Sequence, residues 1–325
     1  MRNQLQQSYP EKQKLILMPK ISLEQAIYAT VRYWSLFDMP VTSTQIWRAL
    51  VQLRGQHIQA TLPIIQEALH TSIWLKNKLD TQWGYYFLKN NKDIVERRLV
   101  RHRISHTKWA LLRKIVRKLQ YLPFIQMIAT NGSLSISNTN KDSDLDVLIV
   151  VKSGRLWTAR LCLLLVTQLM GHRRKYWDQR APDKICLNHY VTDTSLEISP
   201  EIRSMYTAML YSHLVLLSGE NMYKQFMHAN KHWLSEFVVQ PEVPDLPSVH
   251  AVRSGALGRA LQYFFEFFLS EPLADYIEYA AEYFQRRLIE KHSEPGRAGR
   301  IAVSNTELAF HPDSKARWVI EQFQY

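Results

Sequence analysis

Two aspartates separated by one leucine are the residues best suited to chemistry in this 325-residue sequence. Asp144 and Asp146 begin an apolar run that continues to Val151. Because side chains alternate between the two faces of a β-strand, both carboxylates would point the same way. Like charges on one sheet face repel each other unless a cation compensates them, and paired carboxylates suit Mg²⁺ or Mn²⁺. The pair therefore predicts a divalent-metal site on a strand.

A glycine corner precedes the two aspartates. Gly132 and Ser133 follow an apolar run, residues 124–130, that is typical of a buried strand, and ten residues separate Ser133 from Asp144. Glycine has no side chain, so the backbone can turn tightly there and approach a ligand. Ser133 adds a hydroxyl and an N–H at the same corner. Together the corner and the aspartates predict one binding site, which the strands around them must position.

At these residues the chain resembles the nucleotidyltransferase superfamily, which includes DNA polymerase beta, kanamycin nucleotidyltransferase and the minimal nucleotidyltransferases. The resemblance rests on Asn131-Gly132-Ser133, on Asp144-Leu145-Asp146 and on the apolar runs around them. It covers about residues 107–198, less than a third of the chain. It implies a small mixed sheet with helices on one side. It also implies transfer of a nucleoside monophosphate from an NTP to a hydroxyl-bearing acceptor, with release of pyrophosphate.

The resemblance also implies roles for individual residues. Gly132 and Ser133 would bind the β- and γ-phosphates of the NTP. Asp144 and Asp146 would ligate two Mg²⁺ or Mn²⁺ ions, which align the attacking hydroxyl and neutralise charge on the α-phosphate. Arg160, on the helix predicted after the metal strand, is a candidate for a phosphate contact, with an ordinary helix-surface arginine as the alternative.

The next core strand departs from the family pattern, which places a third carboxylate there. The strand predicted at residues 184–192 carries Asn188 and His189 at the expected place. Asn188 could ligate a metal through its carbonyl oxygen, but it has no charge and is a poor base. Asp193 and Glu197 lie just beyond and are alternatives. Two interpretations follow: an active nucleotidyltransferase, or a non-catalytic nucleotide- or nucleic-acid-binding regulator with a degenerate nucleotidyltransferase fold.

A third interpretation takes Asp144-Leu145-Asp146 as the metal motif of a sugar-nucleotide glycosyltransferase. Those enzymes do not need a glycine corner ten residues upstream, so Gly132 and Ser133 argue against it. Transfer or hydrolysis from a UDP-sugar would favour it.

Positive charge is concentrated in one stretch. The net charge is +12, and residues 97–118 contain nine Lys or Arg and no Asp or Glu. One interpretation is the solvated face of an amphipathic helix, and the other is a surface that follows phosphates of nucleic acid. The helix predicted at residues 107–119 would expose Lys108, Arg113, Lys114, Arg117 and Lys118 on one face.

The N-terminal third predicts a winged-helix-like module. Capping boxes at Ser22 and Thr42 begin two helices, the second of which passes Leu53 and ends at Arg54-Gly55, and a third helix covers about residues 62–70. Residues 72–79 and 85–89 then predict two strands. The third helix has no Lys or Arg, which suits a packing module at least as well as a DNA-groove reader.

The C-terminal third predicts mostly helix. A helix begins at Ser199-Pro200-Glu201 and ends at Gly219, and others cover about residues 222–237, 257–269 and 273–291. A late hairpin is predicted at residues 301–310. Five aromatic residues between Tyr263 and Phe268 could face a membrane or a partner, but packing in the core is the favoured interpretation. By resemblance this region would close the cleft and select the acceptor.

These patterns predict an α+β fold with a small mixed sheet flanked by helices, and a cytoplasmic protein. Cys162 and Cys186 provide no disulfide framework, the N-terminus lacks a signal-peptide core, and no apolar run is long enough to be a transmembrane segment. The expected divisions are a polar tail at 1–20, the winged-helix-like domain at 21–90, a basic helical connector at 91–122, the nucleotidyltransferase core at 123–198 and a helical C-terminal domain at 199–325.

Overall fold

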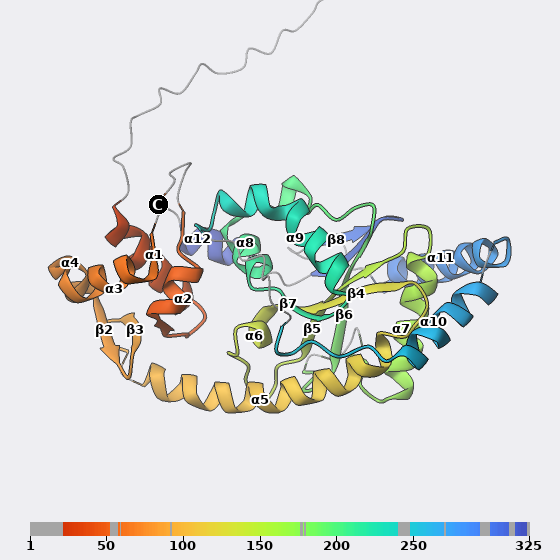
Figure 1. Cartoon of the computed structure of the whole chain (residues 1–325), viewed down its shortest axis with the longest axis horizontal. Helices are drawn as coiled ribbons and strands as arrows, with labels where there is room; N and C mark the ends of the chain where they lie inside the picture. The colour runs from red at the N-terminus through yellow and green to blue at the C-terminus, as the bar shows by residue number, and fades with distance from the viewer. Residues whose placement is uncertain are drawn as a thin grey trace, which may run out of the picture.

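The computed structural model of the chain describes residues 22–52, 58, 60–91, 93–175, 178, 180–239, 248–269, 271–292, 300–311 and 316–323. The polar tail predicted at residues 1–20 lies outside this described part. Helices and two sheets make up the described chain, as the expected α+β class requires. In Figure 1, the long helix α5 (Ile94–Leu119) runs along one side of the molecule and joins an N-terminal module to a mixed sheet.

The N-terminal module contains short helices and a small antiparallel sheet in the order β1-β3-β2. Both predicted capping boxes are confirmed, because Ser22 and Thr42 each accept a hydrogen bond from the backbone of the glutamine three residues later. Pro63 lies in the first turn of the third helix, where proline is tolerated. The elements are α1 (Leu23–Ser35), β1 (Val41–Thr42), α2 (Ser43–Arg48), α3 (Leu62–Thr71), α4 (Ile73–Lys78), β2 (Leu79–Gln82) and β3 (Tyr85–Leu88).

The strand predicted at residues 72–79 is wrong over most of its length. Residues 73–78 form helix α4, and β2 begins only at Leu79. The side chain of Ser72 accepts a hydrogen bond from the Leu75 N–H at 3.1 Å. This cap starts a helical turn and buries Leu75, while Ile73 stays exposed.

The second predicted helix is shorter than expected. It ends at Arg48, and its predicted stop at Arg54 and Gly55 lies outside the described residues. The backbone after it pairs with a distant segment instead of continuing the helix. Gln52 N–H donates to Phe237 O at 2.7 Å, and Val239 N–H donates to Leu50 O at 2.9 Å.

The central sheet has the strand order β7-β4-β5-β6-β9-β8 among the described residues. Neighbouring strands are antiparallel except β5 and β6, which are parallel and are joined by the crossover helix α7. The three predicted core strands and the crossover helix are therefore confirmed. The elements are β4 (Ile125–Thr130), α6 (Gly132–Ser135), β5 (Leu145–Val151), α7 (Leu156–Leu169), β6 (Ile185–Thr192), β7 (Val215–Ser218), β8 (Arg300–Val303) and β9 (Glu307–His311).

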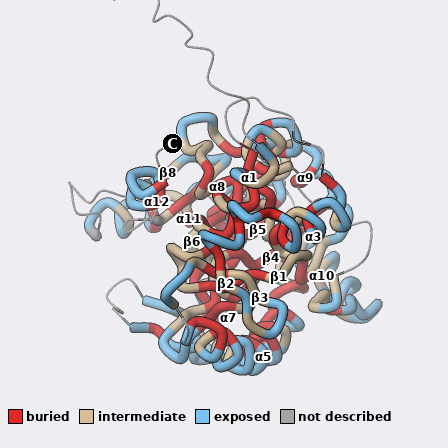
Figure 2. The backbone as a smooth tube through the Cα atoms, turned by 90° about the vertical axis from the view of Figure 1, so that its left-hand side faces the viewer, coloured by how far each residue is buried: buried red, intermediate tan, exposed pale blue. Residues whose placement is uncertain are grey.

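Each face of the central sheet packs against its own apolar core. Met127, Leu148 and Val150 face a core shared with α8, α9 and the N-terminal module. Val147 and Ile149 face a second core shared with α5 and α7. Figure 2 shows the buried backbone in the strands at the centre and exposed backbone on the outer helices. The sheet is thus covered on both faces, which fits its nearly continuous apolar strands.

The region after residue 198 contributes one more strand than the prediction of mostly helix with a late hairpin. It supplies β7 at one edge of the central sheet and the predicted hairpin, β8 and β9, at the other edge. The three other predicted helices are present. The helical elements are the 3₁₀ turn Pro200–Ile202, α8 (Met205–Ser212), α9 (Glu220–Ser235), α10 (Ala256–Phe268), α11 (Leu273–His292) and α12 (Ala316–Gln322).

The helix predicted from Ser199 to Gly219 is interrupted because its last residues pair with β4. Residues 215–218 form β7, which covers the edge of β4 that would otherwise be unpaired. Gly219 adopts a φ of +85°, and a Cβ added there would lie 2.0 Å from the Gln126 carbonyl oxygen. This close approach leaves no space for a side chain, so glycine ends the strand rather than a helix.

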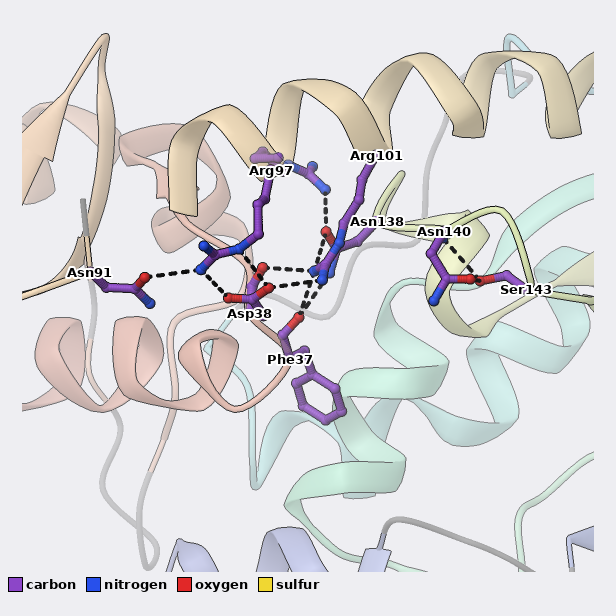
Figure 3. Close-up of polar contacts among 9 residues, drawn as sticks. Phe37, Asp38, Asn91, Arg97, Arg101, Asn138, Asn140 and Ser143 are labelled. Carbon is purple, nitrogen blue, oxygen red and sulfur yellow. Dashed lines mark hydrogen bonds and ion pairs between the residues drawn. The ribbon is translucent and has the colours of Figure 1, made fainter. Parts of the chain in front are cut away.

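Helix α5 fastens the N-terminal module to the rest of the chain. Arg97 and Arg101 both reach Asp38 in the turn after α1, with nitrogen–oxygen distances of 2.8 Å (Figure 3). The Arg101 guanidinium also donates to the Asp38 carbonyl at 2.9 Å. These contacts use cations that the sequence pattern had assigned to a solvated or phosphate-binding face.

Lys108 was predicted on the exposed face of α5, and this is wrong. Its ammonium group is buried and contacts Asp183 Oδ1 at 2.7 Å and the Ser143 carbonyl at 2.7 Å. The helix is also longer than the predicted one, and it buries residues from Ile94 onward. Among the described residues, no helix combines the length and apolar character needed to cross a bilayer.

Candidate functional site

The strands bring together the two aspartates singled out in the sequence. Asp144 directly precedes β5, and Asp146 is its second residue. Cys186 on β6 pairs directly with Asp146 across the parallel strands. Ligand atoms of these three side chains lie within 4.8 Å of one another. The neighbouring Leu145 and Val147 are buried in the sheet, as predicted.

The glycine corner lies against the second aspartate. Gly132 begins the short helix α6 with a φ of +71°, and an added Cβ would come within 2.9 Å of Asp146 Oδ2. The Thr130 hydroxyl donates to the Asp146 carbonyl at 2.6 Å and so joins the end of β4 to β5. The backbone at residue 132 can therefore approach the carboxylate only because it lacks a side chain.

The surroundings of Asp146 disfavour the charged form of its carboxylate. Burial, followed by the negative charge of Asp144, raises the pKa of Asp146 to about 7. Hydrogen bonds from Cys186 and Asn188 act in the opposite direction but are weaker. Burial, followed by Asp146 and Asp144, also raises the pKa of the Cys186 thiol well above its usual value. A cation placed between these groups would relieve the repulsion.

Arg174 supplies a cation that contacts Asp144 in this structure. Its guanidinium bonds to Asp144 Oδ2 and lies 3.6 Å from Cys186 Sγ. A run of basic residues such as 172–175 usually indicates a solvent-exposed loop, so the sequence did not identify this residue. The loop instead runs beside the start of β6, where Arg174 N–H donates to the Ile185 carbonyl at 3.2 Å. That pairing carries no local sequence signal.

Of the three residues considered as a third metal ligand, only Asn188 lies beside the two aspartates. Asn188 reaches Asp146 with its side-chain amide. Asp193 lies beyond the far end of β6, where it accepts hydrogen bonds from Gln126 at 2.8 Å and from the Ser153 N–H at 2.9 Å. Glu197 pairs with Arg203. Within the described part of the chain, neither Asp193 nor Glu197 joins the group formed by Asp144 and Asp146.

His189, which shares the predicted third-acid position, is a core residue. It is buried, and its ring nitrogens lie 3.2 Å from the Tyr211 hydroxyl and 3.3 Å from Glu307 Oε1. These contacts make His189 a core residue with partners for both ring nitrogens rather than a metal ligand.

A cavity of about 1650 Å³ opens beside the aspartates. Gly132, Ser133 and both aspartates line it from the sheet, and Asn188 and Arg160 also contribute. The N-terminal module contributes three aromatic residues, Tyr33, Trp34 and Phe37. Helix α7 contributes the leucines Leu161, Leu164 and Leu165. Helix α11 contributes Gln285, Leu288 and Ile289. The cavity is therefore formed by the sheet, its helices and the N-terminal module together.

Arg160 and Arg173 give the cavity a cationic part. Arg160 donates to Gln285 Oε1 at 2.5 Å, and its guanidinium lies 5.2 Å from the centre of the Phe310 ring. Neither arginine has an acidic partner within the described chain, and the Nε atoms of both are buried without a hydrogen-bond partner there. Burial lowers the pKa of Arg160, and nearby Arg173 adds to this effect. Half-buried arginines whose Nε atoms are buried and unbonded, and which have no acidic partner in the described chain, favour binding of an anion.

Five other cations of α5 lie outside the contacts with Asp38 and Asp183, whereas Arg98 is buried and donates to the Ser137 and Ile136 carbonyls. Arg103, Lys114, Arg117 and Lys118 are exposed and Arg113 is half-buried. On α3, the exposed residues are Pro63, Ile64, Gln66, Glu67, His70 and Thr71, so this helix presents no Lys or Arg. Nucleic-acid binding therefore stays a prediction for α5 alone.

Comparison with protein-family models, with curated proteins and with solved structures finds no match for this chain. We therefore infer its function from the geometry of the site itself.

Proposed function

We propose that this protein transfers a nucleoside monophosphate from an NTP to a hydroxyl-bearing acceptor, with release of pyrophosphate. One observation carries the proposal: the Gly132 backbone lies against the Asp146 carboxylate, which with Asp144 borders a cavity of about 1650 Å³. Ligand cavities commonly measure roughly 300–1,000 Å³, so this one has room for a nucleotide and an acceptor. The order of strands and crossover helix supports a core of the nucleotidyltransferase type.

The donor groups of the site fit Mg²⁺ or Mn²⁺. Asp144 and Asp146 offer carboxylate oxygens, and Asn188 offers an amide within reach of the same place. The raised pKa of Cys186 keeps its thiol protonated at neutral pH, so we do not count it as a ligand for a hard ion. When bound, the metal ions would align the attacking hydroxyl and neutralise charge on the α-phosphate.

The other residues of the site would position the substrates. The Gly132 and Ser133 backbone and the Ser133 hydroxyl orient the terminal phosphates, while Arg160 and Arg173 neutralise an anionic group. A metal ion held by Asp144 would displace Arg174, whose guanidinium would then be able to contact a phosphate oxygen. Phosphoryl transfer depends mainly on positioning and electrostatic stabilisation, so the missing third carboxylate does not prevent it.

The N-terminal module would act as a packing element of the winged-helix type. Its element order, three helices with a short strand after the first and a terminal hairpin, supports that interpretation once α4 is treated as an insertion. Its aromatic residues Tyr33, Trp34 and Phe37 line the cavity, so the module would help enclose the substrates. The lack of cations on α3 favours this role over DNA reading.

The proposal is tested by metal-dependent NTP binding. We expect the chain to bind a non-hydrolysable NTP analogue only with Mg²⁺ or Mn²⁺, measured by isothermal titration calorimetry. Asp144→Asn and Asp146→Asn should each weaken binding at least tenfold, which corresponds to about 1.4 kcal/mol. Asp142→Asn is the matched control, because Asp142 is exposed in the same loop and should leave binding unchanged.

A second experiment tests transfer itself. NTPs with Mg²⁺ or Mn²⁺ and pooled hydroxyl acceptors should release pyrophosphate, and both site variants should lose this activity. NTP binding without transfer to any acceptor would favour the degenerate, non-catalytic regulator. Absence of metal-dependent NTP binding in the unaltered chain would contradict the proposal.

A further inference from the structure

Helix α10 presents polar and small residues to the protein and aromatic residues to the solvent. Gly258, Gln262 and Glu266 lie four residues apart, on the side that faces the loop before β4. Gln262 donates to the Ile125 carbonyl at 3.1 Å, and Glu266 accepts from the Phe124 N–H at 2.7 Å. A Cβ at Gly258 would lie 2.3 Å from the Tyr121 ring, so the helix packs closely there. These contacts fix which side of α10 faces inward.

The opposite side of α10 is aromatic and exposed. Core packing was the favoured prediction for this segment, and it is wrong, because α10 has no buried residue. The inward side is occupied by the polar contacts described above, so the rings cannot turn into the core without breaking them. The exposed fractions are 68% for Tyr263, 55% for Phe264, 45% for Phe265, 74% for Phe267 and 58% for Phe268.

Helix α11 repeats the same arrangement. The Glu278 carboxylate accepts from the Trp157 and Thr158 N–H groups at 2.8 Å and so caps the start of α7. Gln285 donates to the Trp157 carbonyl at 2.9 Å. The outward side carries Tyr276, Tyr279, Tyr283 and Phe284, exposed by 74%, 70%, 43% and 69%. Both helices lie at the end of the molecule opposite the N-terminal module (Figure 1).

The exposed aromatic area matches a stable protein interface. A fully buried Phe or Tyr removes roughly 150–250 Å² from solvent, so the nine partly exposed rings offer on the order of 1,000 Å². A stable complex buries about 800 Å² on each partner. Solvent-exposed apolar patches of a monomer rarely exceed a few hundred Å². The nine rings on these two consecutive helices therefore expose more apolar surface than a monomer usually leaves uncovered.

We propose that the aromatic faces of α10 and α11 form the interface between two copies of this chain. A two-fold dimer places the same surface on both partners, so aromatic rings of one copy pack on those of the other. Homodimer interfaces are the most apolar class, and aromatic residues are enriched in them.

The charge of these helices argues against a membrane or a nucleic acid as the partner. Residues 256–291 contain six acidic and four basic residues, although the whole chain has a net charge of +12. Amphipathic helices that bind anionic lipid carry Lys and Arg beside their apolar face, and nucleic-acid sites need the same cations. The basic residues of this protein are concentrated in α5 instead.

The test measures the oligomeric state of the full chain. Analytical ultracentrifugation should find a dimer at concentrations on the order of 10 µM. The double variant Phe267→Glu/Phe268→Glu should weaken dimerisation at least about a hundredfold, because central aromatic residues dominate interface energy. The matched control is Ile73→Glu/Trp83→Glu, which charges two exposed apolar side chains of the N-terminal module and should leave the dimer intact.

Hydrogen exchange provides a second measurement that does not depend on a variant folding. Backbone amides of α10 and α11 should become more protected as the concentration of the unaltered chain rises through the dimer range. A monomer at all concentrations, or a dimer that persists in Phe267→Glu/Phe268→Glu, would overturn the proposal. Binding of a monomer to phosphatidylcholine vesicles would overturn it in favour of a membrane.

Discussion

Burial raises the pKa of Asp146, and a bound cation would relieve the cost of ionising this carboxyl. Its carboxylate lies beside Asp144 and beneath the Gly132 backbone, where the proton is held more tightly than in water. Because the pKa of Asp146 is about 7, the folded chain binds a proton that the unfolded chain has lost above pH 4. The free energy of unfolding of the metal-free protein should therefore decrease as pH rises from about 4 through 7.

Metal binding should show the opposite pH dependence. A metal ion binds the deprotonated carboxylate, so protonation of Asp146 competes with it below pH 7. We expect the apparent affinity for Mn²⁺ to rise roughly fivefold between pH 6 and pH 7, by about another twofold up to pH 8, and then to level off. Calorimetric titration in buffers of different ionisation enthalpy would also detect the released proton. Affinity that does not change over this range would contradict the pKa of Asp146.

Gly132 can be tested against a glycine with the same backbone but no neighbour. Gly132 and Gly154 have φ values of +71° and +73°, yet only a Cβ at Gly132 would meet another atom, Asp146 Oδ2 at 2.9 Å. Alanine at either position should cost about 1–2 kcal/mol of stability. Gly132→Ala should also weaken Mn²⁺ binding at least tenfold, while Gly154→Ala should not. Equal Mn²⁺ affinities in the two variants would show that the close approach is unimportant.

At the scale of elements, ion pairs and hydrogen bonds between Asp38 and α5 join the N-terminal module to the long helix. Hydrogen bonding from Arg97 is the largest cause that lowers the pKa of Asp38. The group is partly exposed, so we expect Asp38→Asn to cost only about 1 kcal/mol in urea unfolding. The control Glu220→Gln, in an exposed pair on α9, should cost less.

The pH dependence of this variant follows from the direction of the shift. A lowered pKa stabilises the folded chain above the ordinary value of 3.8, and that stability is lost as pH falls through the folded value. The difference between Asp38→Asn and the unaltered chain should therefore disappear in acid below pH 3.8. A difference that persists there would mean that packing, not charge, holds the module.

The sequence correctly predicted the helices and strands that are determined by residues close together in the chain. The capping boxes at Ser22 and Thr42 and the apolar strands around Gly132 and Asp144 depend on neighbouring residues, and the structure has them as predicted. The strand β7 was not predicted, because residues 215–218 become a strand only by pairing with β4. A helical apolar pattern cannot reveal a partner nearly ninety residues away.

The same limit applies to the candidate site. Asp144, Asp146 and Gly132 belong to one continuous stretch, so their juxtaposition could be predicted from spacing and strand alternation. Arg173 and Arg174 reach the site through pairing beside β6, and a run of basic residues in a loop usually means solvent exposure. Lys108 was misplaced for a related reason, because its acidic partner, Asp183, is 75 positions away.

At the scale of the whole molecule, the cavity depends on regions distant in sequence. The N-terminal module, the central sheet and α11 each contribute part of its wall. Because α11 also carries part of the proposed dimer surface, one helix faces the cavity on one side and the partner copy on the other. The aromatic faces of α10 and α11 were the clearest failure of the sequence interpretation, since an apolar stripe does not show whether it faces a core or another chain.

The order of strands in the central sheet has a consequence for synthesis on the ribosome. The middle strands β4, β5 and β6 emerge first, while both of their outer neighbours, β7 and β9, come later in the chain. The edge formed by β4 stays open until residues 215–218 leave the exit tunnel, and the edge formed by β6 stays open until residues 307–311 do so. Open sheet edges can pair with other chains. We expect ribosome-bound chains that stop before β9 to recruit chaperones, and this recruitment should decline once β9 can close the second edge.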